Sequence, residues 1–431
     1  MSRRRAVVAE QRGEADPVGR ALLAKGPDCP QSSDVSLVRT LAPSPVTPPA
    51  AERPPPRRPV PAATMGTALA LFMAARLLGA AAVALAAWAV GERPVLLLGR
   101  SWDSIWYLRI AGNGYGRSLR FHPDVVHSDL AFFPLYPGLL RSVTELTPLS
   151  GPAAGLLVSW TAAGVAACGI YAIGARLHDR AVATALVLLW ALLPHSVVLS
   201  MAYTEPVLTA FAAWSLYAVL TGRWVWAGTL AVGAGLARPN GFAVAAAVLA
   251  AAAYEFWRRR GKVTHRLWTG AALAPLGWVG YVLWVGRRQG DPLGGYFEVQ
   301  RLWGSRFDFG LDALRFVRHL LLEGDLLVFP VSMVTVAAAL LLYGLLLADR
   351  APLPLLVYAG VLLFVAAGGA GFFECKPRFL LPAFPLLLPL ACALVRTARA
   401  RPWHATLVVG ALAGLSFTYG AYLVVLAHKP L

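Results

Sequence analysis

Long apolar blocks separated by short polar segments constrain this chain more than any other feature of its sequence. Hydrophobic residues make up 58% of the 431 residues and charged residues only 14%, so a block of about twenty residues can cross a bilayer with few charges inside it. Blocks of that length and composition are typical of membrane-spanning helices. The sequence therefore predicts an all-α, polytopic membrane protein.

The apolar blocks fix the expected number of crossings. One further stretch, Trp224–Tyr254, is interrupted at Arg238-Pro239-Asn240-Gly241 and predicts two short helices joined by a tight turn, because Pro and Gly break a helix where the backbone faces protein or water. With that pair, the sequence predicts about ten or eleven spans. The other candidate spans are Thr67–Val90, Gly151–Ile173, Ala181–Ser200, Pro206–Leu220, Leu267–Val285, Leu326–Leu347, Pro352–Ala370, Leu380–Val395 and Thr406–Leu426.

Basic residues in the short loops predict the orientation. If the N-terminus is cytoplasmic, every basic cluster falls inside, and the two long loops, Gly91–Ser150 and Gly286–Asp325, fall outside. The net charge of +17 is then explained by orientation and by anionic lipid rather than by nucleic acid, for which no basic-aromatic module is present. We expect a multi-pass protein of the cell membrane whose active face is extracytoplasmic. The clusters are Arg176–Arg180, Arg223, Arg258–Arg266, Arg350 and Arg396–Arg401.

The first 64 residues are expected to stand apart from the membrane domain, residues 65–431. They are rich in Pro and Arg and poor in large apolar residues, which predicts a disordered cytoplasmic tail or, alternatively, a true start at Met65. The four cysteines are scattered and show no metal-binding spacing, and the chain has no D-x-D pair and no Walker A loop. No cofactor or bound metal is predicted.

Asp103 is the carboxylate of greatest interest. It follows the first span and is flanked by Trp102, Trp106 and Tyr107, rings that favour the membrane interface, so a short interfacial helix is expected here. A partly desolvated carboxylate at this place can act as a general base toward a sugar hydroxyl. Equally, an Asp just before Ser104 can cap that helix, and both explanations remain open.

Other polar residues fall on the same predicted face. His127 and Asp129 lie in the first loop, where the following Phe132 and Phe133 are expected to pack against the bundle. Glu205 begins a span, either as a first-turn acid that complements the helix dipole, or as a contact for the acceptor or a second carboxylate of the site.

Two motifs of the first loop are similar to those of the PIG-V family of membrane mannosyltransferases and its actinobacterial relatives. They are W-D-x-x-x-Y-x-x-I-A-x-x-G-Y from Trp102 and H-x-x-x-A-F-F-P-x-Y-P from His127, and the similarity extends from about Met65 to Leu426. The resemblance implies a GT-C fold with a large extracytoplasmic first loop and a polyprenyl-phosphate-mannose donor. It also implies that the carboxylate of Asp103 is the catalytic group. Weaker similarities lie at Pro194-His195-Ser196, Tyr203-Thr204-Glu205-Pro206, Ala237–Gly241 and Pro377–Pro385.

Such a donor requires cationic groups at the external rim, where negative charge develops on the leaving phosphate. Arg238, Lys376 and Arg378 occupy predicted external turns and are the candidates, although the latter two can also reach the interface as ordinary snorkelling residues. We expect contacts with the substrates from Trp102, His127, Asp129, Glu205 and Asn240.

The sequence thus predicts an enzyme that transfers mannose from polyprenyl-phosphate-mannose to an extracytoplasmic glycolipid, glycan or protein, with Asp103 as general base. A transporter or flippase of lipid-linked sugars is the alternative, suited by broken helices and by Arg76, an isolated cation within the first span that needs a carboxylate partner or a water-filled groove. A GT-C enzyme for another sugar is a third possibility. Polar residues gathered on one face, and the lack of repeated halves, favour the enzyme.

Overall fold

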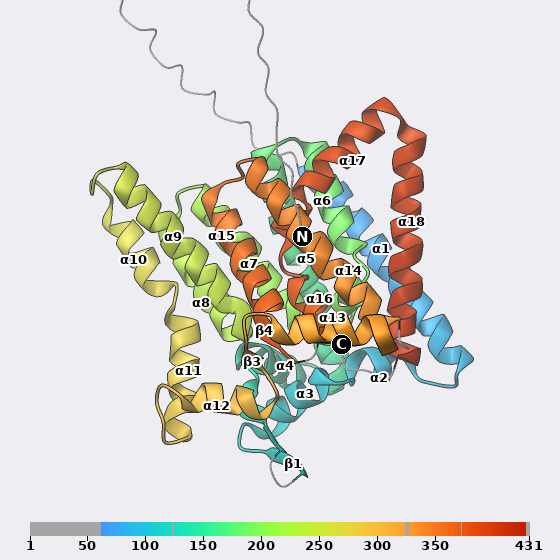
Figure 1. Ribbon diagram of the computed structural model, residues 1–431, viewed down its shortest axis with the longest axis vertical. Helices are drawn as coiled ribbons and strands as arrows, with labels where there is room; N and C mark the ends of the chain where they lie inside the picture. Colours follow the sequence, from blue (N-terminus) through green and yellow to red (C-terminus); the bar gives the residue numbers. More distant parts are fainter. Residues whose placement is uncertain (1–61, 123–124, 324–326, 372, 428–431) are drawn as a thin grey trace, which may run out of the picture. The chain divides into compact units, whose positions relative to one another are not determined.

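The computed structural model of the protein describes residues 62–122, 125–323, 327–371 and 373–427 (Figure 1). These residues belong to one compact unit, Pro59–Leu431. The predicted tail, residues 1–64, lies outside the described residues except for its last three.

Helices make up nearly all of the described structure, which confirms the all-α, polytopic class. They are α1 (Ala62–Ala89), α2 (Pro94–Gly99), α3 (Asp103–Asn113), α4 (Leu135–Leu146), α5 (Gly151–Leu177), α6 (Arg180–Ala191), α7 (Glu205–Leu220), α8 (Trp224–Ala237), α9 (Phe242–Arg258), α10 (His265–Leu273), α11 (Leu276–Arg288), α12 (Gly295–Leu302), α13 (Leu311–Glu323), α14 (Val328–Ala348), α15 (Leu353–Gly368), α16 (Lys376–Leu380), α17 (Leu388–Ala400) and α18 (Pro402–Ala421).

The structure also contains two small antiparallel strand pairs outside the helices, which the sequence did not predict. The hairpin β1 (Ser118–His122) and β2 (Val125–Ser128) lies within the first long loop. The pair β3 (Arg306–Phe307) and β4 (Gly369–Ala370) joins the second long loop to the segment that precedes α16.

Six segments among the described residues are long and apolar enough to cross a membrane, and a seventh candidate is a pair of helical segments, Phe373–Leu380 and Phe384–Ala400, bent by 77°. The apolar helices α6, α7, α8 and α15 are shorter than a full span. The predicted ten or eleven crossings are reached only if these short helices cross as well.

Proline explains where the expected spans are broken. The predicted span Ala181–Ser200 ends as an α-helix at Ala191, and a 3-10 turn, Ser196–Ser200, follows Pro194. The predicted break at Arg238–Gly241 is present as a 3-10 turn, Pro239–Gly241, between α8 and α9. Because Pro lacks an N–H and clashes with the preceding turn, each break leaves carbonyls outside the helical ladder, and side chains bind them: Trp278 Nε1 donates to Pro239 O at 2.8 Å and Arg76 Nη1 donates to Ser196 O at 2.5 Å.

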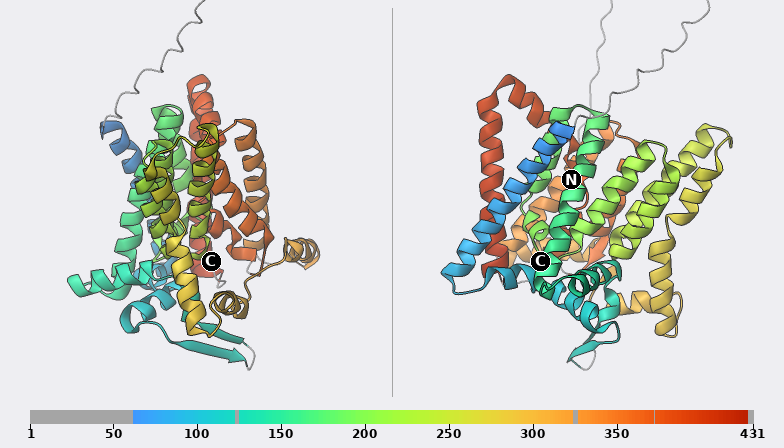
Figure 2. Two further views of the ribbon diagram at one scale, coloured as in Figure 1. Left: turned by 90° about the vertical axis from the view of Figure 1, so that its left-hand side faces the viewer. Right: turned by 180° about the vertical axis from the view of Figure 1, so that it is seen from behind.

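The breaks gather at one end of the bundle. The turns between α9 and α10 and between α17 and α18 lie at the opposite end from α3, α12 and β1 (Figures 1 and 2). Helix α13 runs crosswise to the spanning helices, as an interfacial helix does, and leaves Leu311 and Leu314 exposed.

Small residues allow α5 to pack closely against α7 and against the segment that precedes it. A Cβ on Gly155 would lie 2.8 Å from the Cβ of Ala202, and one on Gly169 would lie 2.9 Å from the Cβ of Ala213. Close backbone approach of this kind is how helices associate where lipid supplies no hydrophobic driving force. It fixes the position of the segment that leads into α7.

Candidate functional site

Asp103 begins helix α3 directly after a strained residue. The backbone of Trp102 has φ 47° and ψ −115°, a conformation that costs a bulky L-residue on the order of 1–3 kcal/mol and persists only when neighbours impose it. Two hydroxyls impose it here, since Ser104 Oγ donates to Ser101 O at 2.7 Å and Ser101 Oγ donates to Leu97 O at 2.6 Å.

The carboxylate of Asp103 is held by a guanidinium rather than by the helix. Asp103 Oδ2 lies 2.8 Å from Arg378 Nη1, and no capping hydrogen bond to its side chain is present among the described residues of α3. This arrangement shows that Asp103 does not cap the helix, because a cap would direct the oxygens at the backbone N–H groups of the first turn, and the general-base role stays a prediction.

A second carboxylate lies behind the first pair. Glu205 Oε1 is 3.2 Å from Arg378 Nε and also pairs with Arg238 Nη1. These are close charge contacts outside hydrogen-bond geometry, so neither Glu205 oxygen is hydrogen-bonded within the described part of the chain. Asp103, Glu205, Arg238 and Arg378 thus form one cluster, here called the ionic quartet, in which two positive charges face two negative ones.

Each arginine of the ionic quartet stands at a helix break. Arg238 follows the end of α8, where a Cβ on Gly241 would lie 2.0 Å from Ala234 O, so only glycine closes this turn. Arg378 lies on the short helix α16. Beyond α16 the chain is anchored by Trp190 Nε1, which donates to Leu381 O at 3.0 Å, and by Tyr358 OH, which donates to Pro382 O at 3.0 Å.

Burial separates the two carboxylates of the ionic quartet. The side chain of Asp103 is 22% exposed and that of Glu205 only 1%. The side chains of Arg238 and Arg378 are 7% and 6% exposed. Asp103 is therefore the acidic member that a bound molecule can contact, whereas Glu205 is enclosed by its partners.

Residues that the sequence pattern placed beside the candidates, without a role of their own in the site, complete the surroundings. Thr204 Oγ1 accepts from Arg238 Nη1 at 3.0 Å and lies 3.3 Å from Tyr107 OH. The guanidinium carbon of Arg378 lies 5.2 Å from the ring centres of both Tyr203 and Phe379, within cation–π range. The Tyr203-Thr204 step before Glu205 was the available signal in the sequence.

Lys376 lies apart from the ionic quartet. Lys376 as a whole residue is 3% exposed, and its Nζ lies 4.8 Å from the ring centre of Phe373. This Nζ has no hydrogen-bond partner among the described residues. An ammonium buried in this way is free to bind an anion, since no carboxylate lies within ion-pair distance in the described part of the chain.

The first-loop residues have different surroundings. Asp129 is buried, and its carboxylate accepts from the N–H groups of Gly116 and Arg117, each at 2.9 Å, so it holds the loop together. His127 stacks on Trp303 with ring centres 4.1 Å apart, and partial burial lowers the pKa of His127. Asn240 is buried within the turn after Arg238. The predicted substrate contacts of these three residues stay predictions.

Arg76 has a backbone partner. Its Nη1 donates to Ser196 O at 2.5 Å, while Nε and Nη2 have no hydrogen-bond partner within the described part of the chain. Of the two expected surroundings, the carboxylate partner is not present among those residues, and the water-filled groove stays a prediction. The guanidinium ties α1 to the 3-10 turn after α6. The adjacent His195 is buried with both ring nitrogens unpartnered among the described residues.

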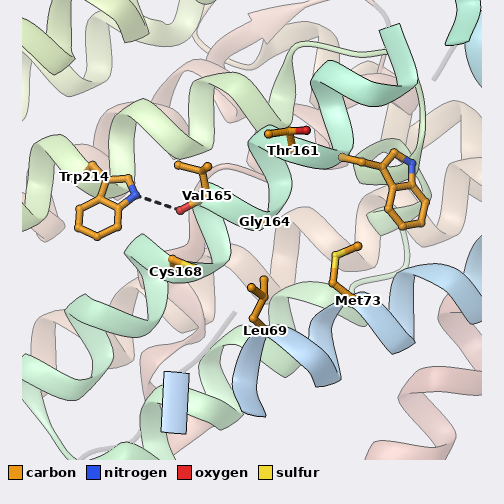
Figure 3. A pocket seen from close by; sticks show the side chains of 8 residues that line it. Leu69, Met73, Thr161, Gly164, Val165, Cys168 and Trp214 are labelled. Carbon is orange, nitrogen blue, oxygen red and sulfur yellow. Dashed lines mark hydrogen bonds between the residues drawn. The ribbon is translucent and has the colours of Figure 1, made fainter. Parts of the chain in front are cut away.

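An open groove of about 610 Å³ lies between α1, α5 and α7 (Figure 3). Its lining is almost entirely apolar, and Gly164 lies between Thr161 and Cys168 along α5. One lining residue contacts the segment that leads to Glu205, because Trp160 Nε1 donates to Ser200 O at 3.3 Å. The other lining residues are Leu69, Met73, Val165 and Trp214.

Comparison with known proteins identifies the fold. No protein-family model and no curated protein sequence matches the chain. The oligosaccharyltransferase of Archaeoglobus fulgidus in its apo form is similar in structure, with a TM-score of 0.51 and 14% identity over 84% of this chain. The same archaeal enzyme in complex with an inhibitory peptide and a dolichol-phosphate gives a TM-score of 0.47 at 13% identity over 85% of this chain. This chain spans 56% of the length of each of these neighbours.

The apo comparison and the helical architecture together define the class of fold. The chain is a polytopic, all-α membrane protein of the GT-C type, as the sequence predicted. At 14% identity the similarity concerns the fold alone. Its activity must be argued from the ionic quartet.

Proposed function

We propose that this protein is a membrane glycosyltransferase related to the PIG-V family, which moves mannose from polyprenyl-phosphate-mannose to a glycolipid, glycan or protein acceptor on the extracytoplasmic face. The observation that carries the proposal is a partly exposed carboxylate, Asp103, in contact with a buried guanidinium, Arg378. A base and a cationic group side by side are what transfer from a phosphate leaving group requires.

The chemistry assigns a role to each group. Asp103 takes the proton of the acceptor hydroxyl while that oxygen forms its bond to the anomeric carbon of the sugar. The bond from this carbon to the phosphate oxygen breaks, and its electron pair remains on the phosphate beside Arg378. Attack from the side opposite the phosphate inverts the anomeric centre. Lys376, whose ammonium has no hydrogen-bond partner among the described residues, and Arg238 supply further positive charge.

Two further features support a lipid-linked donor. The site lies among helix ends at one end of the bundle, where the headgroup of a membrane lipid is available. The groove between α1, α5 and α7 offers an apolar surface for a polyprenyl tail, and it is connected with the Ser200–Glu205 segment.

The test is a transfer assay on purified protein in vesicles that contain polyprenyl-phosphate-mannose and membrane lipid acceptors. Asp103→Asn and Asp103→Ala are expected to lose at least about a hundredfold in rate, the usual contribution of a general base. Asp179→Asn is the matched control, because Asp179 forms a 2.7 Å ion pair with Arg399 Nη2 away from the ionic quartet.

Full activity in a folded Asp103→Asn protein would refute the mechanism. Transfer from a different polyprenyl-phosphate sugar only would retain the enzyme class and replace mannose. Movement of the lipid-linked sugar across the bilayer without transfer would instead establish the transporter alternative.

A further inference from the structure

We propose that the phosphate of the donor replaces Asp103 as the counter-ion of Arg378, and that the carboxylate released in this way is the one that takes the acceptor's proton. This inference rests on the proposed function and adds an order to it, in which the base becomes available only once a donor is bound. It starts from the unequal burial of the two carboxylates in the ionic quartet.

Glu205 is the permanent counter-ion. Its side chain is 1% exposed and touches the guanidinium groups of both Arg238 and Arg378, so it is shielded from a molecule that binds at the exposed side of the cluster. A carboxylate held between two buried arginines fixes where their charges lie, and Glu205 is therefore a positioning residue rather than a substrate contact.

Asp103 is the exchangeable counter-ion. It makes one contact with Arg378, through Nη1 at 2.8 Å, and its side chain is 22% exposed. Arg378 Nε already lies 3.2 Å from Glu205 Oε1, and Nη2 forms no ion pair among the described residues. A phosphate that approaches from the exposed side thus meets the guanidinium edge that Asp103 occupies, where planar, two-oxygen binding suits a phosphate as well as a carboxylate.

The charges of the cluster support this exchange. Without donor, the two arginines are balanced by Asp103 and Glu205. A phosphodiester brings one negative charge, so Glu205 and the phosphate together balance the two arginines and leave Asp103 as the surplus anion. In a site from which water is largely excluded, a surplus carboxylate is a stronger base than a paired one.

The reaction then preserves the balance. The acceptor's proton moves to Asp103, which becomes neutral, and the breaking bond to the sugar carbon leaves its electron pair on the phosphate, which gains one negative charge. Arg378 therefore stays neutralised before, during and after the transfer. The total charge of the four groups and the phosphate does not change.

This arrangement has a consequence that distinguishes it from an ordinary binding role for Asp103. The carboxylate competes with the phosphate for one guanidinium in the free protein. Removing its charge should strengthen phosphate binding while it abolishes transfer, whereas loss of a residue that merely helps to hold the donor would weaken binding.

The experiment measures the dissociation constant of farnesyl phosphate for the full chain in detergent micelles by titration calorimetry at constant pH and ionic strength. Asp103→Asn should bind about tenfold more tightly than the unmodified protein, the effect of removing one partly exposed competing charge. Asp179→Asn, which breaks the more exposed Asp179–Arg399 pair outside the ionic quartet, should leave the constant unchanged.

A double-mutant cycle makes the assignment to Arg378 specific. In an Arg378→Gln background, binding should weaken and the further change Asp103→Asn should no longer strengthen it. Equal or weaker binding by Asp103→Asn would overturn the exchange while leaving Asp103 free to be the base. Absence of any farnesyl phosphate binding would overturn the lipid-phosphate donor as well. If Asp103→Asn does not fold, Asp103→Ser serves the same comparison.

Discussion

Replacing Glu205 by glutamine should destabilise the protein far more than breaking any surface ion pair. The substitution keeps the shape of the side chain but removes the one negative charge that contacts both Arg238 and Arg378. The cluster then holds two buried positive charges against Asp103 alone. An uncompensated buried charge costs about 3–5 kcal/mol when its partner is removed.

A matched substitution sets the scale for this loss. Glu255 also pairs with two arginines, Arg258 and Arg259, but their side chains are 58% and 56% exposed. Solvent screens such pairs, and Glu255→Gln should cost only about 0.2–1 kcal/mol. The ratio between the two losses is the quantity that tests the burial argument.

Both variants can be unfolded in mixed micelles of increasing denaturing-detergent content, with tryptophan fluorescence as the signal. Unfolding is taken as reversible only where refolding restores the fluorescence of the folded protein. Glu205→Gln should shift the midpoint strongly and Glu255→Gln slightly. If the two variants lose equal stability, Glu205 is not the buried counter-ion of both arginines, and the positioning role inferred for it is wrong.

Further changes test other parts of the structure. Gly164→Leu should fill the groove, because a Cβ there meets only Leu69 Cδ1 at 3.8 Å. It should lower transfer from long-chain donors about fivefold, roughly 1 kcal/mol, but leave transfer from short-chain donors unchanged. Gly414→Leu, with nothing near its Cβ, is the control, and an equal effect of both substitutions would show that the groove does not bind the donor. The N–H of Val182 and then Arg399 hold the pKa of Asp179 below its ordinary 3.8, so the stability it contributes is present above that pH and lost as the pH falls through the lowered pKa. The difference in unfolding midpoint between the unmodified protein and Asp179→Asn should therefore shrink at acid pH; a constant difference would contradict this.

Hydropathy and helix-breaking residues predicted much of the architecture. The apolar blocks located the spanning helices, and Arg238-Pro239-Asn240-Gly241 located the break between α8 and α9, because backbone geometry at Pro and Gly is a local property. The predicted spans Ala181–Ser200 and Leu380–Val395 nevertheless ran through the end of α6 at Ala191 and the 77° bend after α16, although Pro194 and Pro382 stand in these stretches.

The aromatic segment around Asp103 was also evident in the sequence as the start of an interfacial helix. Whether its carboxylate caps that helix or faces another charge could not be derived from neighbours in the chain. The answer depends on Arg378, which is 275 positions away and is brought to Asp103 by the short helix α16.

By itself, then, the sequence determined the membrane class, the breaks at Pro and Gly, and the identity of the charged residues placed near helix ends. Only the tertiary structure decided which charges meet and which remain accessible. Asp103 and Glu205 are chemically alike, yet one is partly exposed with a single partner and the other is enclosed between two arginines. The physical reason is that burial and charge pairing are set by helices far apart in the chain, and these two quantities decide whether a carboxylate acts on a substrate or holds a site together.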